Sequence, residues 1–305
     1  MALHRLASVT IGVPNVTTTL AYYRDFGLTV EEDGWLSTLD GGRQMRIIKA
    51  PRRQLLELVV GADNDDDIAR IRRNLKGLAL THGTAGDTVW GWDPGTGVRA
   101  VVRVEPRIIQ RETPVPAYNG PGSWPRIGER HPGIVRSTRV QPRKLGHTVL
   151  GTPNFDASYA FFADGLGFKV SDRVKDHGVF LRCSIDHHNL LLQKAPVAFL
   201  HHTSWQVDDV DDVGRGAVAM LEDHPERHVW GLGRHYAGSN FFWYLKDPAG
   251  NFSEYYSDMD CIIDDQLWTP ETLEGARGMY LWGPPPPPSF ITPEDLAEQM
   301  IGVHG

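Results

Sequence analysis

The sequence has few cysteines and no long apolar run, and both shortages exclude classes of protein. Only Cys183 and Cys261 occur among 305 residues, so neither a disulfide framework nor a cysteine-based zinc site is expected. No apolar stretch approaches the roughly 20 residues of a membrane-spanning helix. The first residues run directly into a strand pattern rather than a signal-peptide core, which predicts a cytoplasmic protein without a membrane partner.

Basic residues are also too few and too scattered for a nucleic-acid partner. Lys and Arg number 31 against 38 Asp and Glu, and the formal net charge is −7. The basic side chains occur singly or in short clusters, not as a stripe with interleaved aromatics. With cysteine scarce, any metal site must be built from carboxylates and from some of the 13 histidines.

The chain contains two copies of one pattern. The stretch LASVTIGVPNVTTTLAYYRDFGLTV begins at Leu6, and LGHTVLGTPNFDASYAFFADGLGFKV begins at Leu145. Each reads as a strand, a Pro-Asn turn, a helix with central aromatics and a glycine exit into another strand. The correspondence continues downstream to the Asp-Pro turns at Asp93 and Asp247. The spacing far exceeds the roughly 20 to 50 residues of solenoid repeats, which indicates a duplicated domain.

Each copy reads as a βαβββ pattern given twice, which predicts an α+β fold. The boundary is expected in the aperiodic segment 119–137, which is rich in glycine and proline. We therefore expect a first domain over residues 1–135 and a second over residues 136–258.

Residues 259–305 have no counterpart in the repeat. They contain the proline run 284–288 and a helix start at Thr292-Pro293, where Thr suits the N-cap and Pro the first helical position. A proline run favours an extended polyproline II strap. The tail is expected to pack over the domain or over a subunit interface. If it packs over the domain, it can form a lid on the site.

Two histidines stand side by side in FLHHTSWQV, which otherwise alternates like a β-strand. Because neighbouring side chains on a strand point to opposite faces, His201 and His202 are not expected to face the same pocket. One of them should face inward, and the other the far side of the sheet.

The two copies differ at three positions that can hold a metal. Two imidazoles and a carboxylate on three strands form the facial triad of non-haem Fe(II) sites, with open positions for substrate and dioxygen. The second copy has all three of these residue types and the first copy lacks them as a set. This difference predicts a metal site in the second copy, with His202 as the inward histidine. The positions and their counterparts are His147 against Ser8, His202 against Glu57, and Glu254 against Ala100.

Three stretches carry a family resemblance: LGHTVL, LHHTSW and, most specifically, GRHYAGSNFFWYLKDPAGNFSEYYSD from Gly233. They resemble the two-domain extradiol ring-cleaving dioxygenases of the vicinal oxygen chelate superfamily, over nearly the whole chain. The resemblance implies two domains of paired βαβββ modules in cupped mixed sheets. It also implies a metal-free first domain and Fe(II), occasionally Mn(II), in the second.

The implied reaction is cleavage of a substituted catechol by O₂ next to its two hydroxyls, giving a hydroxymuconic-semialdehyde type of product. The resemblance makes His147, His202 and Glu254 the metal ligands. It also implies active-site roles for three further residues: His188, chosen over His187, together with His235 and Tyr244.

The substrate-contacting residues are expected to be Trp205, Asn240, Phe242 and Arg234. Trp230 occupies a position where relatives that bind carboxylated catechols have arginine, which favours a neutral hydrophobic catechol. A catechol with a ring carboxylate, bound by Arg182 or Arg234, remains an alternative substrate.

Three alternatives remain beside the dioxygenase. They are a metal-free or metal-dependent binding protein of the same superfamily, a hydroxyphenylpyruvate-type keto-acid dioxygenase and a glyoxalase-like isomerase. The Pro-rich tail argues against the second, and the lack of a fourth ligand argues against the third. The expected partners are a catechol, O₂ and further copies of the chain in a homo-oligomer.

Overall fold

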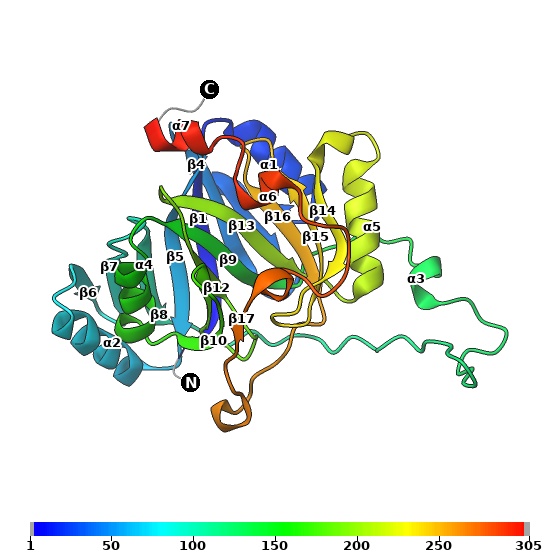
Figure 1. Cartoon of the computed structure of the whole chain (residues 1–305), viewed down its shortest axis with the longest axis horizontal. Helices are drawn as coiled ribbons and strands as arrows, with labels where there is room; N and C mark the ends of the chain where they lie inside the picture. The colour runs from blue at the N-terminus through cyan, green and yellow to red at the C-terminus, as the bar shows by residue number, and fades with distance from the viewer. Residues whose placement is uncertain (1–2, 302–305) are drawn as a thin grey trace.

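The computed structural model describes residues 3–301, which form two large mixed β-sheets with helices packed against them (Figure 1). The first sheet has eight strands in the order β2-β3-β4-β1-β5-β8-β7-β6. Its strands are β1 (Leu3–Val13), β2 (Thr29–Val30), β3 (Trp35–Thr38), β4 (Gly42–Lys49), β5 (Gln54–Ala62), β6 (His82–Ala85), β7 (Thr88–Trp92) and β8 (Arg99–Val104). Its helices are α1 (Val16–Asp25) and α2 (Asp65–Gly77).

The second sheet repeats this order and adds one short strand at its end. The order is β14-β15-β16-β13-β9-β12-β11-β10-β17. Its strands are β9 (Lys144–Thr152), β10 (Lys169–Val174), β11 (Gly178–Arg182), β12 (Leu190–Lys194), β13 (Phe199–Gln206), β14 (His228–Arg234), β15 (Phe241–Lys246), β16 (Phe252–Ser257) and β17 (Thr272–Leu273). Its helices are α4 (Phe155–Tyr159), which continues as a π-helical turn over Ala160–Gly165, and α5 (Val210–Leu221).

The predicted α+β fold with two βαβββ modules in each half is confirmed. In each sheet the first strands of the two modules pair antiparallel at the centre, as β1 with β5 and β9 with β13. Each of these strands also pairs in parallel with the last strand of its own module. The sheets end at residue 104 and resume at residue 144, on either side of the proposed boundary, and the exact domain limits stay a prediction.

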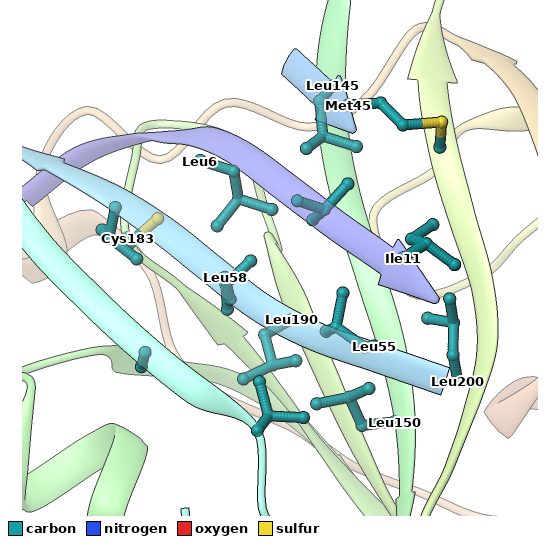
Figure 2. Close-up of a cluster of buried hydrophobic side chains, with 14 of the residues drawn as sticks. Leu6, Ile11, Met45, Leu55, Leu58, Leu145, Leu150, Cys183, Leu190 and Leu200 are labelled. Atoms are coloured by element: carbon teal, nitrogen blue, oxygen red, sulfur yellow. The ribbon is translucent and has the colours of Figure 1, made fainter. Parts of the chain in front are cut away.

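The core of the molecule lies between the two sheets (Figure 2). Leu58 on β5 and Leu190 on β12 belong to one cluster of buried apolar side chains that draws on both sheets. The central strands β9, β13 and β16 are buried along nearly their whole length. One face of the second sheet therefore packs against this core, and a functional site can form only on its other face.

The first helix of each half packs against the opposite half. Phe26, at the end of α1, stacks on Tyr255 of β16 with ring centroids 3.8 Å apart. Ser158 on α4 donates to Asp93 in the loop after β7. These contacts join the two sheets into one body, which holds β16 and its Glu254 rigidly.

Two segments lie outside the repeat. Residues 105–143 connect the two sheets, and their middle part extends from the body as a long arm that carries the short helix α3 (Pro132–Val135) (Figure 1). The two ends of the segment contact the body, where Arg107 pairs with Asp63 and Val140 is buried in the core. The tail after β16 includes β17, α6 (Pro288–Ile291) and α7 (Leu296–Ile301). The helix expected to open at Thr292-Pro293 begins instead at Leu296, after a turn in which Leu296 N donates to Pro293 O at 3.0 Å. Single 3₁₀ turns occur at Glu32–Gly34, Pro225–Arg227, Asp265–Leu267 and Gly275–Gly278.

Within residues 3–301, no helix combines the length and the apolar character needed to cross a bilayer.

Candidate metal centre

Three buried side chains from adjacent strands converge on one point of the second sheet. His147 lies on β9, His202 on β13 and Glu254 on β16, and their ligand atoms all lie within 4.8 Å of one another. His147 Nε2 is 3.2 Å from His202 Nε2 and 3.1 Å from Glu254 Oε2. His202 Nε2 is 3.7 Å from the same oxygen. The register explains the convergence, since His147 and Glu254 both lie opposite Ser204, two residues after His202 on the same face.

The carboxylate of Glu254 is arranged for a cation. Its Oε1 accepts a hydrogen bond from Asn240 Nδ2 at 3.3 Å, whereas Oε2 is buried and accepts none. Burial opposes ionisation, but the nearby His147 and His202 more than offset it and hold the pKa of Glu254 below its usual value. A buried carboxylate oxygen without a donor is costly unless a cation neutralises it. Two imidazole nitrogens and this oxygen therefore fit a divalent metal ion.

The first sheet offers no equivalent donor set. The expected counterpart of Glu254 was Ala100, and the strand register corrects this to Val101. Glu57 pairs with Arg99 as His202 pairs with Phe252, so the position two residues further along is Val101. The loop after Asp93 is one residue longer than the loop after Asp247, which shifts the register. Glu57 itself forms an ion pair with Arg99 at 2.6 Å.

His201 does not face the far side of the sheet, so that prediction is wrong. Its Nδ1 lies 2.8 Å from His202 Nδ1, and both imidazoles line the same cavity. The register between β13 and β9 shifts between Leu200 and His202, and His201 has no partner on β9. Such a β-bulge suspends the alternation of side chains, which sequence periodicity assumes throughout a strand.

His201 connects the tail to His202. Its Nε2 is 2.6 Å from the carbonyl oxygen of Phe290, which can only accept a hydrogen bond, so Nε2 carries the proton. Burial lowers the pKa of His201 to about 4, so the ring is neutral near pH 7 and its Nδ1 accepts from His202 Nδ1–H. His202 Nε2 is then left with a free lone pair directed at His147 and Glu254.

This connection predicts that His201→Phe weakens metal binding by about 10- to 100-fold, the usual effect of removing a partner that orients a metal-ligating histidine. The affinity is to be measured by competition with a chromogenic chelator. The control is His82→Phe on β6 of the first sheet, which should leave the affinity unchanged. Equal affinities for the two variants would contradict the assigned role.

Of the second His-His pair, His188 lines the cavity and His187 lies behind it. The ring of His188 is 4.2 Å from that of His147 between centroids. Burial, with smaller contributions from neighbouring histidines such as His147, lowers the pKa of His188 well below its usual value. A neutral imidazole therefore stands beside the three candidate ligands.

His235 and Tyr244 meet on another wall of the same cavity. His235 Nδ1 donates to the carbonyl of Met279 in the tail, so its Nε2 accepts from the Tyr244 hydroxyl at 2.9 Å. Burial raises the pKa of Tyr244 well above its usual value, so the phenol stays protonated. The pair can take part in hydrogen bonding or proton transfer with a bound hydroxyl.

The four side chains expected to touch the substrate do not line this cavity. Trp205 is buried in the core between the sheets, because it follows His202 by three residues and faces the opposite way. Asn240 holds Glu254 instead, through its hydrogen bond to Oε1.

The other two lie further out. Phe242 stacks behind His235 with ring centroids 4.1 Å apart, so His235 stands in front of it. Arg234 lies over the ring of Phe241 and pairs with Asp258 on the outer surface. Strand phase alone places Trp205 on the face opposite His202, whereas for the other three side chains it does not show which of them reaches the cavity.

The cavity has a volume of about 250 Å³ and an apolar lining. Among the described residues that line it, none is Lys, Arg, Asp or Glu. Sequence reasoning missed most of this wall. The signal in the sequence is the aromatic-rich tail, for which a lid over the site is one of the expected roles. Besides the histidines and Tyr244, the lining includes Val149, Val174, Phe180, Leu191, Trp230, Ala237, Met279, Phe290 and Ile291.

The fold and the site define a class, a paired-module β-sheet protein with a buried His-His-Glu metal centre beside an apolar cavity. Residues 144–255 match the model of the Glyoxalase/Bleomycin resistance protein/Dioxygenase superfamily. Metapyrocatechase 2 of Cupriavidus necator is 33% identical over 303 residues, which cover 95% of this chain and 92% of that protein. The chain therefore belongs to the extradiol dioxygenases of this superfamily.

Two further matches bear on the metal. An iron-dependent extradiol dioxygenase of Rhodococcus jostii is 27% identical over 154 residues, 46% of this chain and 50% of that protein. The crystal structure of a Mn(II)-bound glyoxalase from Novosphingobium aromaticivorans superposes with a TM-score of 0.73 at 25% identity. The match covers 94% of this chain and 95% of that one. The fold therefore occurs with either metal.

Proposed function

We propose that this chain opens the ring of a substituted catechol with O₂ beside the two hydroxyls, using Fe(II) held by His147, His202 and Glu254. The carrying observation is the buried carboxylate oxygen Glu254 Oε2, which accepts no hydrogen bond and lies within reach of two imidazole nitrogens. A bound metal ion supplies positive charge that favours ionisation of the catechol hydroxyls and a place where catechol and O₂ meet. Mn(II) suits the same donors and is the second candidate.

The residues around the three ligands perform the remaining tasks. The apolar walls exclude water and hold the ring. Tyr244 can accept a hydrogen bond from a substrate hydroxyl while its own proton is shared with His235 Nε2. His188, on another side of the cavity, can take or return a proton near the dioxygen position. The expected product is a hydroxymuconic-semialdehyde type of compound.

Reconstitution tests the proposal directly. The chain is loaded anaerobically with Fe(II) or with Mn(II), and 3-methylcatechol and air are then added. A yellow ring-fission product with at least one of the metals is expected, and the more active metal is the assigned one. Failure to turn over any catechol of a panel with either metal would instead favour the metal-dependent binding protein.

We propose a neutral, apolar substituent on the catechol. The cavity lining carries no charged side chain, and both arginines considered for a ring carboxylate have other partners. Arg182 is bonded to Asp265 and Arg234 to Asp258. We expect kcat/KM for 3-methylcatechol to exceed that for 3,4-dihydroxybenzoate by about 100-fold or more, because a carboxylate would be buried without a partner. Equal values would contradict this assignment.

We propose that the chain forms a homo-oligomer through the tip of the arm, residues 117–131. The tip is held by its own hydrogen bonds, among them Arg126 N to Asn119 Oδ1 at 3.0 Å and Arg126 Nε to Ala117 O at 2.6 Å. Even so, Trp124 is 68% exposed and Ile127 is 84% exposed. A shaped segment that presents large apolar side chains is typical of an interface. A second copy is the partner we propose, because chemistry on a small molecule needs no other protein.

The double variant Trp124→Asp/Ile127→Asp should reduce the oligomer to a smaller species, as measured by light scattering on a sizing column. Val218→Asp, an exposed apolar position on α5, serves as control and should leave the mass unchanged. An unchanged mass for the arm variant would reject the arm as the contact.

We also propose a cytoplasmic location. It is supported by Cys183 and Cys261, both of which are free thiols in a chain without a disulfide among its described residues. Cell fractionation with an antibody to the chain would test it.

A further inference from the structure

Behind His188 lies a chain of hydrogen-bonding groups that the proposed reaction does not use. Asp172, on β10, is buried, and its Oδ2 lies 3.0 Å from His187 Nε2. His187 has no exposed surface, and its Nδ1 lies 3.1 Å from His188 Nδ1. The other oxygen of Asp172 accepts from the backbone N–H of Glu271 at 2.8 Å, which fixes the carboxylate in place.

The chemistry of these groups determines where the protons lie. A carboxylate only accepts, so His187 Nε2 carries a proton and donates it to Asp172. With that one N–H in the neutral form of the ring, His187 Nδ1 has a lone pair. The contact between the two Nδ1 atoms then requires the proton to lie on His188 Nδ1. His188 Nε2 is left with a lone pair, and His188 lines the cavity.

We propose that Asp172, acting through His187, holds His188 in the tautomer that presents an Nε2 lone pair to the cavity, on the side assigned above to dioxygen. This inference rests on the proposed function for the identity of the bound molecule. Asp172 and His187 are positioning residues, since the cavity lining includes neither of them. A positioned imidazole in the wrong tautomer offers a donor where an acceptor is needed, which is costly to catalysis.

The first His-His pair supports this interpretation because it is connected in the same way. There the carbonyl of Phe290 accepts from His201, and His201 accepts from His202. In both pairs the first histidine in sequence donates its Nε2–H to a fixed acceptor and accepts, at its Nδ1, the Nδ1–H of the second. In both, the Nε2 of the second histidine is left with a lone pair.

Asp172→Asn should reverse the proton pattern. The Asn amide can donate to His187 Nε2 while its oxygen still accepts from Glu271 N–H. His187 would then carry its proton on Nδ1 and donate it to His188 Nδ1. His188 would carry its own proton on Nε2, as a donor facing the cavity.

The decisive measurement is ¹⁵N NMR of the metal-free full chain labelled at histidine, with the His188 signals assigned by their loss in His188→Gln. We expect an Nδ1–H tautomer for His188 in the unsubstituted protein and an Nε2–H tautomer in Asp172→Asn. Asp186→Asn is the control, because the Asp186 carboxylate pairs with Lys144 and forms no hydrogen bond with either imidazole, and it should leave the His188 tautomer unchanged. An Nε2–H tautomer of His188 in the unsubstituted protein, or a doubly protonated His187, would overturn the proposal even if Asp172→Asn does not fold.

Kinetics of the metal-loaded enzyme give a second readout. Asp172→Asn should lower kcat by about 100-fold, at the low end of what one positioned acid or base contributes, with little change in bound metal. A loss of bound metal in proportion to kcat would assign Asp172 a merely structural role. An inactive unsubstituted chain that shows the expected tautomer would count against the dioxygenase function and not against the Asp172 connection.

Discussion

Replacing Glu254 by Gln is expected to abolish tight metal binding and to lower ring-cleavage activity by about 1,000-fold or more. The substitution removes the one anionic donor of the candidate site and leaves the two imidazoles in place. A metal ion contributes several kcal/mol to stabilising charge in a reaction, and about 1.4 kcal/mol corresponds to tenfold in rate. Bound metal after dialysis and turnover of 3-methylcatechol are the two measurements.

The apo form of this variant should be less stable than the unsubstituted apo protein at pH 7, because the folded protein lowers the pKa of Glu254 and therefore stabilises its carboxylate above the usual pKa of a glutamate. Thermal unfolding without metal tests this point. Glu57→Gln is the matched control, since Glu57 occupies the position in the first sheet that His202 occupies in the second. Full metal affinity in Glu254→Gln would refute the assigned centre.

The second large effect is expected for His188→Gln. This variant should lose about 100- to 10,000-fold in kcat, the range of a positioned acid or base, while it retains its metal. His188 stands beside the candidate ligands, with its ring 4.2 Å from that of His147, but does not belong to the ligand group. Turnover at saturating catechol and metal analysis of the same preparation are compared.

His224→Gln serves as the control for this variant, because His224 is exposed after α5 and its imidazole bonds to Glu226, outside the cavity. It should retain full activity. If His188→Gln keeps its kcat, the acid–base role belongs to another group, with His235 and Tyr244 the nearest candidates. If it loses the metal instead, His188 supports the ligands and has no separate chemical role.

Much of the architecture was predictable from periodicity. Alternation with period 2 and helical segments between Gly and Pro turns predicted the βαβββ modules, and both sheets contain them in the same order. The same alternation placed His147, His202 and Glu254 on one face, where the structure brings their ligand atoms within 4.8 Å of one another. The comparison of the two copies worked because a duplicated domain repeats its strand phases.

Periodicity failed where the backbone departs from regular pairing. The bulge at His201 turns that imidazole toward the cavity, and a one-residue difference between two loops shifted the counterpart of Glu254 from Ala100 to Val101. Neither irregularity alters the alternation of apolar and polar residues from which the strand was predicted. Both become visible only when the hydrogen-bonded partners of each residue are known.

The sequence by itself determined the modules, their duplication, the phase of the three candidate ligands and the scarcity of thiols that leaves histidine and carboxylate as donors. Only the tertiary structure decided what surrounds them. Phe290 meets His201 across 89 residues of sequence, and Asp172 meets His187 across 15. Strand and helix patterns are local and follow from backbone geometry. Such contacts depend instead on how whole elements pack, and no repeat in the sequence records which distant side chain fills a given space.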